Sequence, residues 1–210
     1  MPRNYNYCPP PRMTAFITHC WKKCLEWLIL LALLVAGLLT TSAALAGSIE
    51  PKNAGLTPDE RGQALTTEFA IDLGPRLEEA VTRGVPLHFR LEFTLARKRW
   101  YWVDEHVAGH VLDYRLSYHA LTRQYRLALG GLHRNFDALD EVLQVLSHTA
   151  RLHVVDRAAL TPGETYAAAV RLSLDHNQLP KPLQIDALAD RDWRVEARTL
   201  RWNFVLTGEK

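Results

Sequence analysis

The sequence predicts an α+β fold: a β-rich, antiparallel, sandwich-like domain with two helices, which follows an N-terminal hydrophobic segment. Three observations predict this class. At least six segments alternate apolar and polar residues, the pattern of a strand with one buried face. Only two segments after the hydrophobic stretch show helical spacing. The strands alternate instead of being apolar throughout, which favours an antiparallel sheet over the buried parallel sheet of a βαβ fold.

The first 46 residues have the composition of an export signal. Residues 28–39 are all apolar or small, two lysines precede them, and an Ala-x-Ala motif ends at Ala46. These features describe a secretory signal peptide, so we expect cleavage after Ala46 and a periplasmic protein. The alternative is a retained inner-membrane anchor with the domain facing the periplasm, because residues 27–46 have the length that spans a bilayer, roughly 20 residues. Membrane contact would then occur only through this segment.

Cysteine position and charge narrow the class of protein further. Cys8, Cys20 and Cys24 all precede the apolar stretch, so a processed domain has no thiol and no disulfide. The leader holds four basic residues and one acidic residue, and its removal leaves a nearly neutral domain of about 160 residues, enough for a sizeable core. Nucleic-acid binders carry a strong basic excess, so we expect no nucleic-acid partner.

The processed chain begins with a segment rich in turn-forming residues. Residues 47–63 contain two prolines and three glycines, which predicts a loose leading segment, with a first edge strand and a turn as the alternative. One β-rich domain is expected over residues 64–207. Alternation over residues 65–73 predicts its first full strand. Pro75 and Gly84 then fit the first turn and the end of a short helix.

The most regular strand pattern in the chain is PLHFRLEFTLARKRWYW, residues 86–102. Every odd position from Leu87 to Leu95 is apolar, and the even positions between them are polar or charged. The apolar positions change parity after Leu95, so we expect a bulge or a strand end near Lys98. A cluster of basic and aromatic residues therefore follows the best core strand.

The second half of the chain predicts more strands and one stronger helix. Asn135 is expected to cap a helix that runs to about His148, and a Pro-Gly turn is expected at residues 162–163. Residues 179–182, with two prolines, should be extended and form a connection at a sheet edge, and a second binding surface is the alternative. Strands are expected at residues 112–118 and 125–129, which form a hairpin, and at residues 152–155, 166–174 and 193–206.

Four strings in this sequence resemble one family: VPLHFRLEFTLARKRWYW, YRLSYHALTRQYRL, GGLHRNF and LPKPLQIDALADRDW. It is the proteobacterial exported family called domain of unknown function 4390, and the resemblance extends over residues 65–206. The resemblance implies export and a single domain. It also implies a signalling context, because the genes of the family often stand beside a membrane sensor kinase, which makes such a kinase a candidate partner. It assigns no activity, ligand or catalytic residue.

Metal and catalytic chemistry have weak signals. His106 and His110 are the best pair of metal ligands, but residues four apart on a strand lie about 13 Å apart, and a metal site needs three or four converging ligands. Ser117 and Ser173 lie in alternating strands without a nucleophile motif. We expect no metal, no cofactor and no catalytic residue, and we expect solvated surface at the acidic pairs Glu78-Glu79, Asp140-Glu141 and Asp190/Asp192.

The basic and aromatic cluster at residues 97–102 is the strongest candidate for binding, because arginine and aromatic residues are enriched at binding hot spots. The alternative is that Trp100 and Trp102 cap the core, with arginines stacked on their faces. If the strand alternation continues, Trp100 and Trp102 lie on one face and the odd-numbered residues of the cluster lie on the other. The predicted binding surface consists of Arg97, Arg99 and Tyr101.

These observations together predict an exported, non-enzymatic interaction or sensor domain of the bacterial envelope, which binds a protein partner or an envelope component. The alternative is an envelope hydrolase or a carbohydrate-binding protein, in which tryptophan, tyrosine and acidic side chains would line a groove. A deep pocket with two facing carboxylates would favour this alternative, and an exposed aromatic patch would favour the interaction domain. A structural assembly factor without a ligand is a third class.

Overall fold

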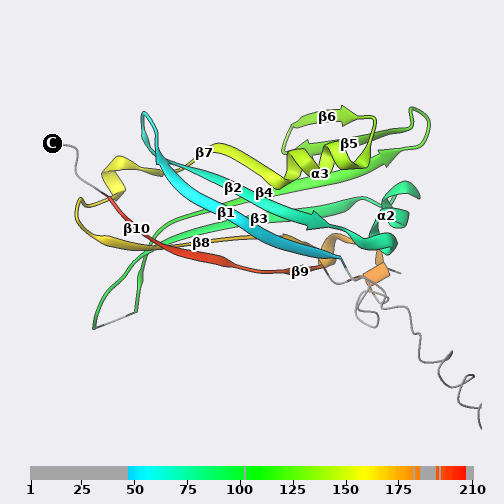
Figure 1. Ribbon diagram of the computed structural model, residues 1–210. Helices are drawn as coiled ribbons and strands as arrows, with labels where there is room; N and C mark the ends of the chain where they lie inside the picture. The colour runs from blue at the N-terminus through cyan, green and yellow to red at the C-terminus, as the bar shows by residue number, and fades with distance from the viewer. Residues whose placement is uncertain (1–46, 102, 182, 185–192, 194, 207–210) are drawn as a thin grey trace, which may run out of the picture. The chain divides into compact units, whose positions relative to one another are not determined.

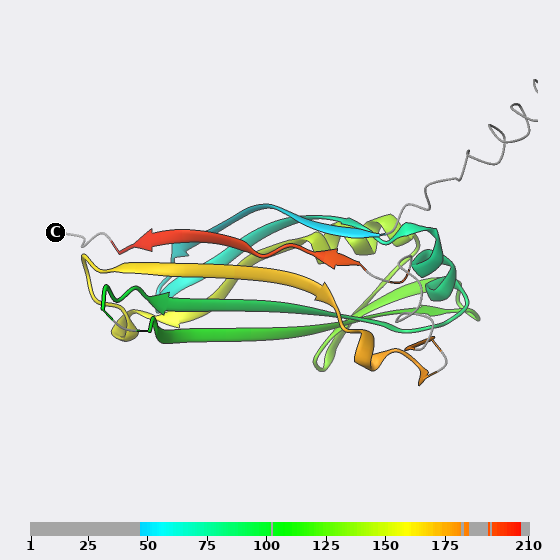
Figure 2. The same ribbon diagram turned by 90° about the horizontal axis from the view of Figure 1, so that it is seen from below.

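The computed structural model describes residues 47–101, 103–181, 183–184, 193 and 195–206. In this part of the chain, ten strands form two sheets that lie face to face (Figures 1 and 2). Nearly all strand pairs are antiparallel, and two α-helices accompany the sheets. The predicted α+β, sandwich-like class with two helices is therefore confirmed. The core between the sheets is apolar and draws on strands of both.

The first sheet has four strands in the order β7-β2-β1-β9. β1 (Ser48–Pro58) and β2 (Gly62–Asp72) pair along their whole length, β7 (His148–Asp156) adds to β2, and the short β9 (Glu196–Ala197) adds to β1 in parallel. The leading segment thus contains the strand and turn that were the alternative prediction, and its eleven-residue strand is not loose. A register shift between Pro51 and Asn53 breaks its alternation, which hides the strand in the sequence.

The second sheet has six strands in the order β10-β8-β3-β4-β5-β6, all antiparallel. β3 is central, and its five odd-numbered residues from Leu87 to Leu95 are at most 2% exposed, as the alternation predicts. β3 ends at Arg97, and its register shifts between Leu95 and Ala96, close to the predicted break. The bounds are β3 (Leu87–Arg97), β4 (Glu105–His119), β5 (Gln124–Leu129), β6 (Leu132–Phe136), β8 (Thr165–Leu174) and β10 (Leu200–Val205).

The two helices follow β2 and β6. α2 (Gly74–Thr82) matches the predicted short helix, with Leu77, Ala80 and Val81 buried. α3 (Leu139–Ser147) begins later than predicted, after an N-cap at Ala138. The prediction of Asn135 as the cap is wrong, since Asn135 pairs with Arg126 inside β6.

The C-terminal part of the chain changes sheets. Trp193 and Val195 are buried, β9 joins the first sheet, and β10 joins the second, so this segment closes one side of the core. The expected extended connection at residues 179–182 is interrupted, because Lys181 is already helical. The alternative of a second binding surface there is not supported by Leu179, which is only 3% exposed. Pro182 lies outside the described residues.

The N-terminal 46 residues, and with them the predicted signal peptide or anchor, also lie outside the described part of the chain. Within the described ranges, no helix combines the length and the apolar character that crossing a membrane requires.

Candidate functional site

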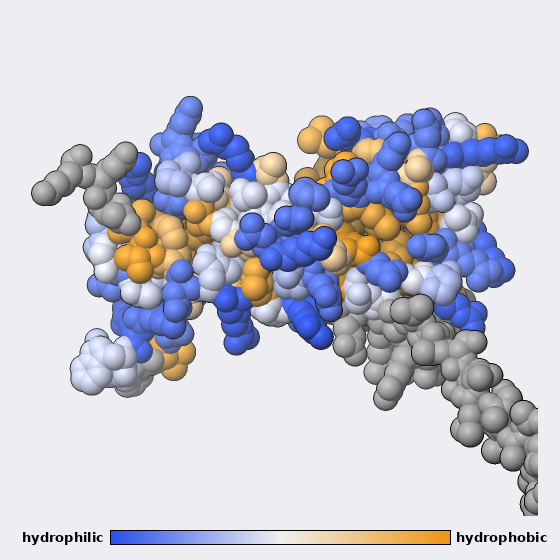
Figure 3. All heavy atoms as spheres, in the orientation of Figure 1, coloured by the Kyte–Doolittle hydropathy of each residue, from blue (hydrophilic) through white to orange (hydrophobic). Residues whose placement is uncertain are grey.

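The loop between β3 and β4 projects beyond the sheets at one end of the domain (Figures 1 and 3). Three of its side chains are strongly exposed: Trp100 at 93%, Tyr101 at 63% and Val103 at 76%. The rings of Trp100 and Tyr101 meet edge to face, with centroids 5.0 Å apart. We call these three residues the hairpin tip. Trp102, between them, lies outside the described residues.

The exposure of Trp100 contradicts the alternative in which this residue caps the core. That alternative extended the strand alternation of β3 through residue 102. β3 ends at Arg97, and its register already shifts between Leu95 and Ala96, so strand parity no longer decides which way the loop side chains point. The loop presents Trp100 and Tyr101 together and not on opposite faces.

Arg97 supports the base of the loop instead of pointing away from the domain. Its side chain is 27% exposed, and a terminal nitrogen of its guanidinium donates to Thr161 Oγ1 at 3.2 Å. The guanidinium carbon lies 5.8 Å from the ring centroid of Tyr166, a fully buried residue of β8. The other terminal nitrogen lies 3.8 Å from Glu105 Oε2. These contacts tie the end of β3 to β8 and to the start of β4.

Arg99 completes the base with the same carboxylate. Its guanidinium lies 2.5 Å from Glu105 Oε2, and its backbone N–H donates to Asp104 Oδ1 at 3.4 Å. Both predicted arginines therefore share Glu105, which offsets their charge. Of the three residues predicted as a binding surface, only Tyr101 is among the tip residues, beside Trp100 and Val103. Strand alternation could not predict that Trp100 and Val103 are exposed, because both residues follow the end of β3 at Arg97.

The other candidates from the sequence do not converge on a site. His106 and His110 both lie on β4, and the His106 ring occupies the space that a side chain at Gly109 would need. Across the described ranges, no three His, Cys, Asp or Glu side chains are grouped so that they would hold a metal ion. Glu78 and Glu79 are exposed on α2. Asp140 and Glu141 lie in the first turn of α3 and are exposed, while Asp190 and Asp192 fall outside the described residues.

The carboxylates of Asp113 and Asp175 face a common partner, Arg90. Asp113 Oδ1 and Asp175 Oδ2 lie 2.9 Å and 3.2 Å from the guanidinium of Arg90. The hydrogen bond from the Gln178 side chain, followed by a backbone N–H and the charge of Arg90, lowers the pKa of Asp175. Arg90 therefore holds both carboxylates in one ion-pair network on the outer face of the sheet.

Comparison with known proteins identifies a family. Neither the curated proteins nor the solved structures give a match to this chain. A family model described as Domain of unknown function (DUF4390) matches residues 46–203. The match includes β1 and all later strands up to the middle of β10, and it extends the resemblance seen in the four sequence strings toward the N-terminus. The chain therefore belongs to the DUF4390 family.

Proposed function

We propose that the chain is an exported, non-enzymatic interaction or sensor domain of the bacterial envelope, and that it contacts a protein partner through the hairpin tip. The observation that carries this proposal is the exposure of Trp100 and Tyr101 at the end of a projecting loop. Leaving large aromatic side chains in water costs free energy, and such residues concentrate at the centres of protein interfaces. A membrane sensor kinase is a candidate partner.

The base of the loop supports this role because it restricts the conformations of the tip. Arg97 and Arg99 both contact Glu105, and the backbone N–H of Lys98 donates to the carbonyl oxygen of Thr165 at 3.2 Å. Because these contacts already restrict the loop, fewer side chains and backbone bonds lose conformational freedom on binding, and the entropy cost of binding is smaller. Tryptophan and tyrosine add large contact areas with few rotatable bonds. In this proposal Tyr101 contacts the partner, and Arg97 and Arg99 position it.

The exported part of the proposal rests on the sequence of residues 1–46. We expect the mature protein to begin at Gly47 and to occur in the periplasmic fraction, which intact-mass measurement of the fractionated protein would establish. If the protein retains its leader and fractionates with the inner membrane, then residues 1–46 are an anchor and not a cleaved signal peptide, and the domain still faces the periplasm.

Site-specific photocrosslinking in living cells tests the contact surface. A photoreactive amino acid at position 101 is expected to give a discrete adduct. The same amino acid at position 121 is the matched control, because Leu121 is an apolar residue that is 91% exposed in the β4–β5 turn, away from the loop. The adduct should disappear when Trp100→Ser is added, and the melting temperature should hardly change, since exposed substitutions alter stability by about 0.5 kcal/mol or less.

Two results would contradict the proposal. One is the same set of adducts from positions 101 and 121, which would mean that crosslinking reports exposure alone. The other is an adduct from position 101 that persists unchanged with Trp100→Ser, which would place the contact outside the hairpin tip.

A further inference from the structure

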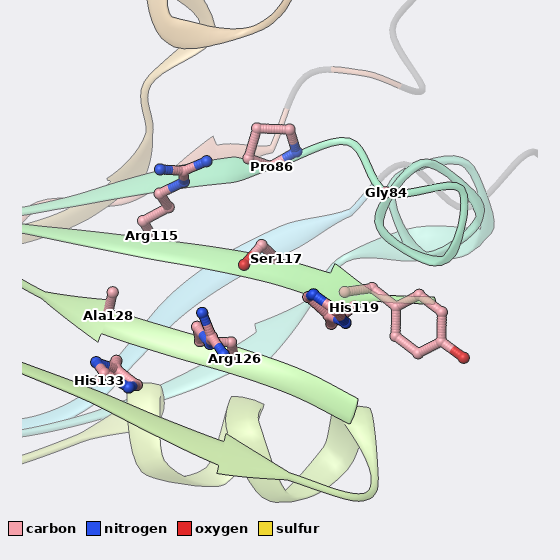
Figure 4. Close-up of a pocket in the computed structure, with 9 residues that line it drawn as sticks. Gly84, Pro86, Arg115, Ser117, His119, Arg126, Ala128 and His133 are labelled. Atoms are coloured by element: carbon pink, nitrogen blue, oxygen red, sulfur yellow. The ribbon is translucent and has the colours of Figure 1, made fainter. Parts of the chain in front are cut away.

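A second surface feature lies on the outer face of the six-stranded sheet, toward the end away from the hairpin tip. There β4, β5 and β6 form a hollow of about 430 Å³ (Figure 4). Arg115 pairs with Ala128, and Ser117 pairs with Arg126, so each long side chain stands opposite a short one. The short side chains of Ser117 and Ala128 leave room beside the two arginines, and the Arg115 guanidinium extends toward Pro86 (Figure 4).

The two arginines at this hollow have no neutralising partner among the described residues. No ion pair joins Arg115 or Arg126 to a carboxylate there, whereas Arg90 on the same face contacts Asp113 at 2.9 Å. The Nε of Arg126 donates to Asn135 Oδ1 at 3.1 Å, which orients the guanidinium without reducing its charge. Arg115 and Arg126 are diagonal neighbours across β4 and β5, where like charges repel one another.

Further donors surround the same space, and none of its described lining residues is acidic. The hydroxyl of Ser117 lies between the arginines, and the imidazoles of His119 and His133 stand at the sides (Figure 4). The neighbouring His88 on β3 pairs with Arg115 in the sheet. Its pKa is lowered first by burial and second by the positive charge of Arg115.

We propose that this hollow binds a phosphate group carried by a larger molecule. A carboxylate has two acceptor oxygens, enough for one guanidinium group. A phosphate has more acceptor oxygens and more negative charge, and therefore suits a site with two arginines and a hydroxyl. The volume of the hollow falls within the range of about 300–1,000 Å³ that ligand pockets occupy, so the group attached to the phosphate also has room. This inference does not depend on the hairpin tip or on its partner.

The phosphate has two possible sources, a soluble phosphate ester or the headgroup of an anionic phospholipid. The hollow lies at the end of the domain where the described chain begins. Gly47 lies against the carbonyl oxygen of Leu73, just before α2, and Gly84 and Pro86, just after α2, line the hollow. A retained N-terminal anchor would hold this end close to lipid headgroups, and a released domain would meet soluble esters.

Two probes separate these sources, applied to the protein as cells process it. The first is glycerol 3-phosphate, titrated by calorimetry against chloride at equal ionic strength. The second is cosedimentation with phosphatidylcholine vesicles with and without phosphatidic acid. The test variant is Arg115→Gln with Arg126→Gln. The matched control is Arg171→Gln with Arg201→Gln, which removes two charges from exposed positions on β8 and β10 of the same sheet face.

Binding of at least one probe is expected, and the test variant should weaken it by about tenfold or more, because each charge-assisted hydrogen bond contributes more than that factor. The control should stay within about twofold of the unmodified protein. Binding of glycerol 3-phosphate identifies a soluble ester, and binding of phosphatidic acid vesicles alone identifies a headgroup. The proposal is overturned when neither probe binds, or when both pairs of substitutions weaken binding equally, which would show attraction to the whole sheet face.

Discussion

Replacing Arg97 by Ala should destabilise the domain, although the residue lies at the base of a surface loop. Its guanidinium lies over the buried ring of Tyr166, which contributes about 1 kcal/mol for a partly desolvated cation. Its hydrogen bond to Thr161 contributes about 1 kcal/mol more. The Nε of Arg97 is buried without an acceptor in the described part of the chain, and this offsets part of the gain. We therefore expect the free energy of unfolding to fall by about 1–2 kcal/mol.

Urea denaturation followed by circular dichroism measures this loss. With a denaturant slope of about 2 kcal/mol per molar, the midpoint should fall by about 0.5–1 M while the slope stays the same. Arg99→Ala is the matched control: it removes the other arginine of the same loop, whose ion pair with Glu105 is exposed on both sides and contributes about 0–1 kcal/mol. Equal and small shifts for both variants would refute the assignment of Arg97 as the anchor of the loop.

Three further predictions concern the core, the charge network and metal dependence. Phe93→Ala should cost about 3–5 kcal/mol in thermal unfolding, because Phe93 is 1% exposed and lies beside Trp202. Asp175→Asn should destabilise the domain at neutral pH. The lowered pKa of Asp175 means that its ionised form adds stability above the unfolded value, 3.8, and that this stability is lost as pH falls through the folded pKa. Urea midpoints of the variant and the unmodified protein should therefore converge in acid, and a constant difference would contradict this origin. A chelator should leave the melting temperature unchanged, whereas a large fall would reveal a metal bound by the folded state.

The strand alternation predicted the central part of the fold because both faces of β3 and β8 have consistent environments. The odd residues of β3 face the core between the sheets, and the even ones face solvent or polar neighbours. The same holds for β8, where Tyr166, Val170 and Leu174 are buried. A period of two in the sequence then translates directly into burial. Neither strand contains a bulge that would interrupt the signal before Leu95.

The errors occur where pairing between distant segments outweighs a local signal. Asn135 is a favourable helix cap, but Gly130 adopts a φ of 56° and turns the chain, so that β6 pairs with β5 before α3 begins. Pro51 suggests a loose segment, yet it sits beside a register shift where its missing N–H costs little. Both outcomes depend on a neighbouring strand, which a local pattern does not contain.

The hollow illustrates how much of a site depends on register alone. Arg115 and Arg126 are separated in the sequence by a turn without glycine, in which Arg123 takes the left-handed conformation at a φ of 54°. Tyr118 and Tyr125 pair across this turn, with ring centroids 4.9 Å apart. Because Tyr118 pairs with Tyr125, the antiparallel register pairs Ser117 with Arg126 and Arg115 with Ala128, so each arginine lies opposite a small residue. A shift of one residue would turn the arginines toward the core, so the same packing that buries the apolar face also sets the spacing of the two charges.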